Sequence, residues 1–162
     1  MKRVEKSEDL YDLWVLLAMT RDAIYRATKE ELSQHGVTPI RSAAMLLINS
    51  LGSKATPPEI GRYLFRKRNS ISDLLMRMEQ AGLVEKFPVS TKRNLKRYEL
   101  TDKGREVYRK TTHLKTIDRV FSSLSNRQRH QLLLLLNVLF KKATEELKIR
   151  VKTPLTVIPE DD

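Results

Sequence analysis

Apolar residues recur at helical spacing near both ends of the 162-residue chain. From residue 9 to about residue 33 they stand at i, i+3, i+4 and i+7, which predicts one long helix that ends at His35-Gly36. Toward the other end, Ser125 and Gln128 form a capping-box sequence ahead of a leucine-rich helix that extends to about residue 147. Each helix would expose an apolar stripe in a monomer of this size, so a partner chain is its natural cover.

Three shorter helices are predicted between these two. Thr38-Pro39 suits the start of the first, and Thr56 with Glu59 forms a capping-box sequence at the start of the second. The third follows a basic turn and ends at Ala81-Gly82. The expected ranges are 39–51, 57–64 and 69–80, with the turn at 65–68.

A short β-hairpin is expected next, because residues 83–87 and 97–100 are typical of strands and flank a polar, basic loop. Pro88 would close the first strand, and a fifth helix is expected from Thr101-Asp102 to about Ser122. A two-stranded hairpin is marginal alone and needs helices behind it. The predicted fold class is therefore mainly α with a small β-hairpin, in the order of a winged helix-turn-helix domain.

The charge of the chain indicates a polyanionic partner. The formal net charge is +11 and the isoelectric point about 10.0. Residues 54–110 hold fifteen Lys and Arg against seven Asp and Glu, a net charge of +8 in about a third of the chain. This concentration favours a face that binds double-stranded DNA over a generally solubilising surface.

The inventory of reactive residues argues against an enzyme. No Gly-rich phosphate loop, Gly-x-Ser-x-Gly or His-Glu-x-x-His sequence is present, cysteine is absent, and the three histidines lie far apart in sequence. We therefore expect no catalytic residues, no metal site and no cofactor. No apolar run approaches the ~20 residues of a membrane span, and no apolar stretch follows the basic start of the chain, so a cytoplasmic protein is expected.

Together, these motifs resemble the MarR family of winged helix-turn-helix transcription regulators. The sequence Glu-Gln-Ala-Gly-Leu-Val at 79–84 is similar to the family's Glu-x-x-Gly-Leu-Val at the end of the recognition helix. Leu-Thr-Asp-Lys-Gly at 100–104 is similar to the exit from its wing. The resemblance covers about residues 9–148, and its other parts are the segments 56–64 and 69–72 and the positions Leu74 and Arg105.

The resemblance implies a homodimer in which the first and last helices of two chains interlock. It assigns residues 1–36 and 105–150 to a helical dimerisation domain and residues 37–104 to the winged helix-turn-helix. Residues 151–162 are expected to form an extended or disordered tail. The implied function is a transcription regulator, a repressor on a pseudo-palindromic operator, released by a small-molecule effector. The alternatives are a non-specific nucleic-acid-binding or architectural protein, and a winged helix that binds only proteins.

The resemblance also places Asn69, Ser70 and Asp73 where the recognition helix meets bases. Asn69 or Ser70 could instead cap the helix, and Asp73 could accept from a cytosine amine or pair with Arg77, which we favour. The basic residues of the turn are expected to contact phosphates, unless they are merely a solvated charge run. The full set expected on this helix and its turn is Arg66, Lys67, Arg68, Asn69, Ser70, Ser72, Asp73 and Arg77.

The wing departs from the family pattern. Members usually carry Asp-x-Arg there, with the arginine in the minor groove. Counting from the wing exit places Lys92 and Asn94 at these positions, whereas a wing longer by one residue places Thr91 and Arg93 there. The aspartate is missing either way, and Arg93 is the favoured minor-groove residue. The wing residues expected to contact DNA are Lys92, Arg93, Lys96 and Arg97.

Two aromatic residues of the first helix have two possible roles. Tyr11 and Trp14 could line an effector pocket between the dimerisation and DNA-binding parts, as the resemblance suggests, together with Arg21. Packing in the core of a dimer is the simpler role for the two rings, because aromatic side chains prefer burial. Arg21 interrupts the apolar face, and the sequence leaves open whether it pairs in a pocket or faces solvent.

Overall fold

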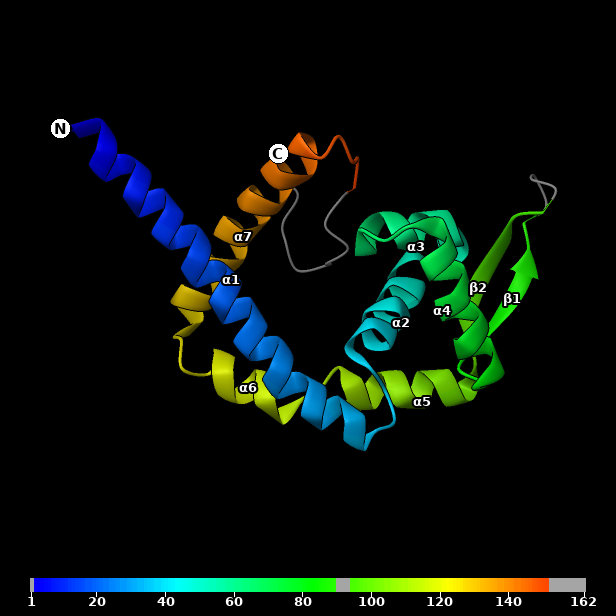
Figure 1. The fold of residues 1–162 in the computed structure, drawn as a ribbon. Helices are drawn as coiled ribbons and strands as arrows, with labels where there is room; N and C mark the ends of the chain where they lie inside the picture. Colours follow the sequence, from blue (N-terminus) through cyan, green and yellow to red (C-terminus); the bar gives the residue numbers. More distant parts are fainter. Residues whose placement is uncertain (1, 90–93, 152–162) are drawn as a thin grey trace.

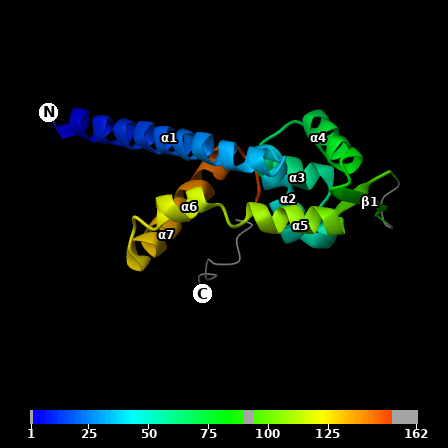
Figure 2. The same ribbon diagram turned by 90° about the horizontal axis from the view of Figure 1, so that it is seen from below.

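The computed structural model describes residues 2–89 and 94–151, with side chains from residue 9 onward. The chain is mainly helical with one antiparallel hairpin, which confirms the predicted fold class (Figure 1). Helices α1, α6 and α7 lie at one end of the molecule and α3, α4 and the hairpin at the other (Figure 2). The elements are α1 (Lys2–Gln34), α2 (Pro39–Leu51), the 3-10 turn η1 (Gly52–Lys54), α3 (Pro57–Leu64), α4 (Arg68–Gln80), β1 (Val84–Pro88), β2 (Lys96–Leu100), α5 (Asp102–Thr111), α6 (Lys115–Phe121) and α7 (Asn126–Glu146).

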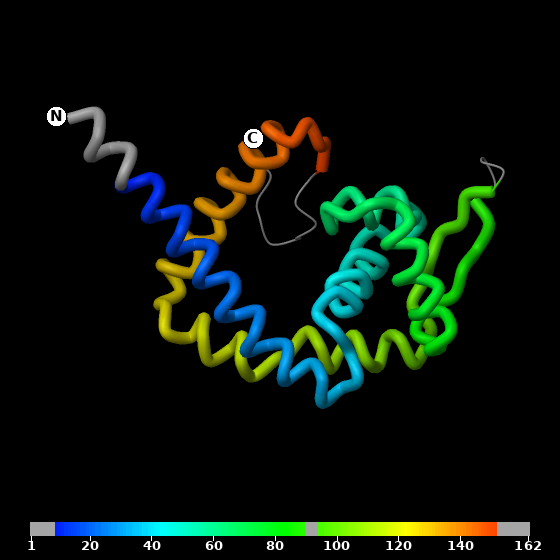
Figure 3. Tube along the Cα trace, in the orientation of Figure 1, coloured from blue at the N-terminus to red at the C-terminus, as the bar shows by residue number. Residues whose placement is uncertain are grey.

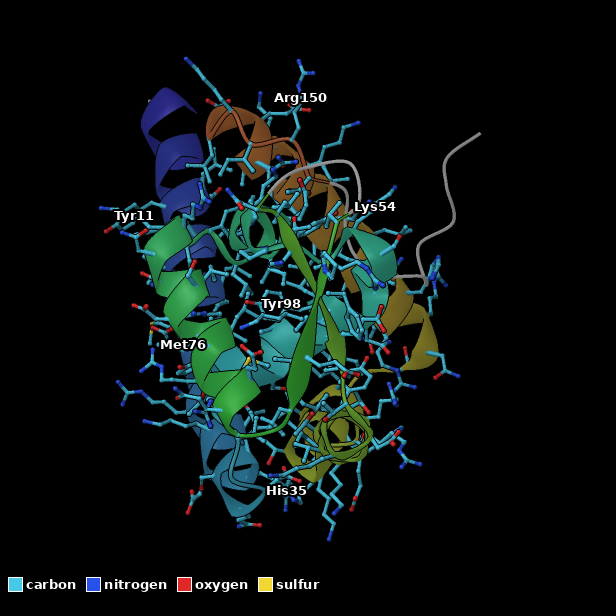
Figure 4. All side chains as sticks on the ribbon, turned by 90° about the vertical axis from the view of Figure 1, so that its right-hand side faces the viewer. Tyr11, His35, Lys54, Met76, Tyr98 and Arg150 are labelled. Carbon is cyan, nitrogen blue, oxygen red and sulfur yellow. The ribbon has the colours of Figure 1, made fainter. Side chains whose placement is uncertain are left out.

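The hydrophobic core lies where α2, α3 and α4 pack against the hairpin. Burying one large apolar side chain contributes about 1.5–3 kcal/mol to the free energy of unfolding. This cluster is therefore the main source of stability in the winged helix-turn-helix region. Tyr98 of β2 lies between the hairpin and the helices behind it (Figure 4). The largest fully buried side chains are Met45, Ile60, Ile71, Leu75, Met78 and Val84.

The hairpin is held on two sides. Its strands pair with Val84 opposite Leu100 and Pro88 opposite Lys96, so β1 extends one residue beyond the predicted range and includes Pro88. On the outer side of β2, the Tyr98 amide donates to the Ala55 carbonyl at 2.9 Å. The segment ahead of α3 thereby joins the sheet edge and anchors the wing to the helix-turn-helix.

The junction of α4, β1 and α5 is tightly packed. Helix α4 ends with Gly82 in the left-handed region (φ +69), and the Leu83 amide reaches back to the Met78 carbonyl, which is the hydrogen bond of a Schellman end. The Leu83 carbonyl accepts from the Thr101 amide at 3.1 Å. Gly104 lies against the same carbonyl, and a Cβ there would stand 1.9 Å from its oxygen. The Leu-Thr-Asp-Lys-Gly sequence thus ends in a glycine because α5 approaches this backbone too closely for any side chain.

The predicted fifth helix is two helices, which corrects the expectation of one helix to Ser122. The chain leaves helical geometry at residues 112–114, and α6 begins at Lys115. Glu31 of α1 accepts from the Lys115 and Thr116 amides at 2.8 and 2.9 Å, which satisfies the free donors at the start of α6. This carboxylate holds α6 against α1, beside which it runs (Figure 3).

Of three other expectations about helix starts, two need correction and one is confirmed. Helix α1 begins at Lys2, ahead of the apolar pattern that marked residue 9. The predicted capping box at Thr56 is wrong. The Thr56 side chain makes no capping hydrogen bond, and Glu59 forms an ion pair with Arg62 at 3.1 Å. The Ser125–Gln128 capping box is confirmed, with both reciprocal hydrogen bonds.

The end of the chain is only partly covered by the structure. The predicted tail, residues 151–162, lies outside the described residues from 152 onward. Within the described ranges, no helix combines the length and the apolar character needed to cross a bilayer.

We predict that Gly104→Ala destabilises the fold by about 2–4 kcal/mol, because its Cβ would overlap the Leu83 carbonyl. Gly82→Ala is the matched control. It also adds one methyl, but the nearest atom outside the turn is a Lys103 carbon at 3.9 Å, so only the left-handed backbone resists it, at about 1–2 kcal/mol. Urea unfolding of both variants measures the difference, and equal losses would contradict the close contact.

We predict that Glu31→Gln lowers the melting temperature near neutral pH and that its difference from the unmodified protein disappears in acid. Hydrogen bonds from Thr116 and then Lys115 hold the pKa of Glu31 below its ordinary value of 4.5. A lowered folded-state pKa means stability that is present above about pH 4.5 and lost as pH falls through the lower folded value. Melting curves from pH 7 down to pH 3 test this, with Glu30→Gln as control. A constant offset across that range would show that the carboxylate charge is not involved.

Candidate nucleic-acid interface

The turn between α3 and α4 is short and is closed by a backbone hydrogen bond. The Arg66 amide donates to the Gly61 carbonyl at 3.0 Å, and the Phe65 backbone is left-handed (φ +52). A Cβ at Gly61 would stand 3.2 Å from the Arg66 carbonyl oxygen and 3.3 Å from Ile71, so the two helices approach closely at this point. The geometry is that of a helix-turn-helix, with α4 as the element that can enter a major groove.

The first turn of α4 exposes Asn69 and Ser70, the two residues expected at base edges. Helix α4 begins at Arg68 with Lys67 as its cap, and no side chain caps it, so the alternative of Asn69 or Ser70 as the helix cap is wrong. With the described residues, neither side chain makes a hydrogen bond, so their polar groups face solvent. Ser72 differs, because its hydroxyl donates to the Arg68 carbonyl at 3.1 Å.

The expected ion pair between Asp73 and Arg77 is not formed. Arg77 Nε donates at 3.2 Å to the backbone carbonyl of Asp73, and the Asp73 carboxylate is left exposed. A carbonyl one turn back is an alternative acceptor that an i, i+4 sequence pattern does not distinguish from a carboxylate. Asp73 therefore keeps its acceptor oxygens available on the outer side of α4.

The turn ahead of α4 and the first residue of the helix present three exposed cations, Arg66, Lys67 and Arg68. Within the described part of the chain, none of these side chains takes part in an ion pair or hydrogen bond. They surround the N-terminus of α4, where free backbone amides and the helix dipole also favour an anion. This arrangement can bind phosphate oxygens while the next turn of α4 faces the groove.

Only part of the wing site lies in the described residues. Lys92 and Arg93 do not, so their expected contacts are not described. Lys96 is exposed, whereas Arg97 forms an ion pair with Glu99 and stacks 4.9 Å from the centroid of the Phe87 ring. Arg97 thus braces the two strands in this structure.

Two further residues belong to the exposed face of α4 and were missed from the sequence. Met76 has an exposed fraction of 49% and lies on the outer side of the helix (Figure 4), and Gln80 is exposed one turn later. Both follow Asn69 and Asp73 at seven-residue spacing, so the helical period alone could have identified them. Near the same end of α4, Lys86 pairs with Glu79 at 3.0 Å, which raises the pKa of Lys86.

The three residues expected in an effector pocket are all exposed on α1. The Tyr11 and Trp14 rings lie 5.5 Å apart between centroids, and Arg21 pairs with Asp22 at 2.5 Å and lies over the Tyr25 ring. A cleft of about 440 Å³ between the helix-turn-helix and the end of α7 is lined by other residues. The assignment of Tyr11, Trp14 and Arg21 to an effector pocket stays a prediction.

Large apolar side chains are exposed along α1 and α7, as expected from the two sequence stripes. Helices α1 and α7 form the arm of the molecule, at the end away from the hairpin (Figure 2). On these two helices the exposed large apolar residues are Leu10, Tyr11, Leu13, Trp14, Leu16, Leu17, Met19, Tyr25, Leu134, Leu135, Leu136, Val138 and Leu139.

No protein-family model matches the sequence, and no curated protein is similar enough to match it. Solved structures match over most of their length. An organohalide-sensing transcriptional regulator, RdhR-CbdbA1625 with bound 2,4-dichlorophenol, has 21% identity and a TM-score of 0.72, over 91% of this chain and 90% of that one. A mutant of MarR from E. coli with operator DNA has 20% identity and a TM-score of 0.69, over 81% and 95%. MepR from S. aureus with DNA has 19% identity and a TM-score of 0.68, over 79% and 96%.

TM-scores of about 0.7 over most of each chain establish a shared fold, which sequence identities of about 20% alone would not. The first of these proteins is a transcriptional regulator, and the other two structures are complexes with DNA. The chain therefore has the winged helix-turn-helix fold of the MarR-type transcription regulators.

Proposed function

We propose that this protein is a MarR-family transcription regulator that binds double-stranded DNA in a sequence-specific manner as a homodimer. The observation that carries the proposal is the first turn of α4, where Asn69 and Ser70 are exposed directly after three exposed cations. Polar groups at a groove-entering turn can distinguish bases, whereas adjacent cations bind phosphates of any sequence. A purely non-specific DNA-binding protein would need only the cations.

The exposed apolar side chains of α1 and α7 support the homodimer. Contiguous apolar surface on a soluble chain commonly marks an interface, and two-fold pairing of identical surfaces is the commonest solution. We assign dimerisation to residues 1–36 and 105–150 and DNA binding to residues 37–104. Two α4 helices related by a two-fold axis would meet successive major grooves, which corresponds to a pseudo-palindromic operator.

A repressor role and release by a small molecule complete the proposal. The dichlorophenol-bound regulator of the same fold supports an effector of that kind. In a dimer, Tyr11 and Trp14 could either pack against the partner chain or line a pocket with Arg21. Arg93 is proposed as the minor-groove residue of the wing.

We predict that Leu135→Glu converts the dimer to monomers, because this α7 side chain, 64% exposed in the single chain, would be buried in the interface. A buried, unpaired carboxylate strongly opposes association. Sedimentation velocity at micromolar concentration measures the oligomeric state. Met76→Glu is the matched control, an exposed apolar residue on α4 that should leave the dimer intact. A monomeric unmodified protein would contradict the model of two half-sites.

We predict that Asn69→Ala flattens base preference at one symmetric pair of operator positions, while Lys67→Ala weakens binding to every sequence. A lost base contact is worth about 1–3 kcal/mol at its own base pair and little elsewhere. A lost phosphate contact lowers affinity for all DNA alike. Binding of both variants to a randomised duplex library at one salt concentration separates the two effects. If Lys67→Ala alters the preference profile and Asn69→Ala does not, α4 enters the groove differently.

A further inference from the structure

Phe65 occupies a backbone conformation that its side chain disfavours. At φ +52 and ψ 43 it ends α3 in the left-handed region, where glycine or asparagine is the usual residue. The residue is also 47% exposed, so burial in the core does not offset the cost of this conformation. A large residue that persists in a strained position points to a role for the side chain itself.

The Phe65 ring contacts a ring on a distant helix. Phe140 of α7 lies with its centroid 6.2 Å from that of Phe65, at an interplanar angle of 62°, which is the edge-to-face geometry that aromatic pairs prefer. Phe140 is half-buried, and Leu147, the residue directly after α7, lines the cleft that Phe65 also lines. The last part of α7 therefore lies close to the helix-turn-helix.

A contact at Phe65 acts on α4 because the turn that holds it has little freedom. The Arg66 amide is bonded to Gly61, and the Ile71 amide is bonded to the Lys67 carbonyl at 3.2 Å. Ile71 is fully buried, and Gly61 leaves almost no space between α3 and α4. The turn and α4 must then move together when Phe65 moves.

We propose that Phe65 and Phe140 form an aromatic latch between the helix-turn-helix and α7, and that these two positioning residues set where α4 stands relative to α7. Its consequence for DNA binding rests on the proposed function. In a dimer held through α1 and α7, the latch in each protomer fixes the separation of the two α4 helices. It thereby restricts the half-site spacing that the protein accepts.

The absence of cysteine from the chain allows a direct measurement of the latch. Gln80→Cys on α4 and Arg127→Cys at the start of α7 introduce two exposed sites for spin labels. Diluting the labelled protein with an excess of unlabelled protein leaves only distances within one protomer. Electron–electron resonance then gives the α4-to-α7 distance distribution, without DNA and in any oligomeric state.

We expect a narrow distribution in the otherwise unmodified protein and a second, displaced population in Phe140→Ala. The ratio of latched to unlatched protein should fall by about fivefold, the usual weight of one aromatic pair. Phe140→Tyr keeps the ring and should keep the narrow distribution. Phe65→Ala should match Phe140→Ala, and the double variant should be no worse than either, because both remove one contact. Unchanged distributions, or additive effects in the double variant, would overturn the latch.

A second experiment, on DNA binding, uses the duplex that the unmodified protein selects from the randomised library. Inserting one base pair between its half-sites should weaken binding of the unmodified protein by several-fold more than binding of Phe140→Ala. Equal losses would overturn the spacing consequence. If the library yields no preferred duplex, the proposed function fails, while the distance measurement still decides whether the latch exists.

Discussion

The winged helix-turn-helix part of this protein depends on the close approach of backbone at Leu83. The end of α4, the start of β1 and the start of α5 all converge on this one residue, through hydrogen bonds of its amide and carbonyl and through the absence of a side chain at Gly104. Helix α4, the hairpin and the helix α5 that leads to α6 and α7 therefore share one tightly packed junction. A displacement of one of these elements is passed to the others, because their backbones are in direct contact with no side chain between them that could move.

Elements whose signals are local could be predicted from the sequence. The hairpin, α4 and its Ala81-Gly82 end, and the Ser125 capping box depend on residues within a few positions of each other. The interruption between α5 and α6 could not be predicted, because the carboxylate that completes α6 comes from Glu31, 84 positions before Lys115. Local competition also defeated two expectations. Glu59 prefers Arg62 to the backbone of Thr56, and Arg77 prefers a carbonyl to a carboxylate.

The candidate site was predictable in outline for the same reason. Cations of the turn and polar residues of the first helical turn follow from order along the chain, and the structure places them exposed and adjacent. Phe65 gave no signal, because its neighbours in sequence indicate neither a left-handed backbone at phenylalanine nor a contact with Phe140 of α7. The sequence also did not show which basic residues are free to bind DNA. Arg97 resembles its neighbours in sequence, but it forms an ion pair with Glu99 and stacks on the Phe87 ring.

The uncovered apolar surface of α1 and α7 gives the two ends of the molecule different thermodynamics. The core around Met45 and Leu75 is closed within one chain, so its free energy of unfolding does not depend on how many copies are present. The arm gains its cover by mass action, and under the proposed dimer its stability rises with protein concentration. At low protein concentration, amide exchange would be fastest in α1 and α7 and slowest in α2 and α4. Dilution would then loosen the arm while each winged helix-turn-helix stays folded.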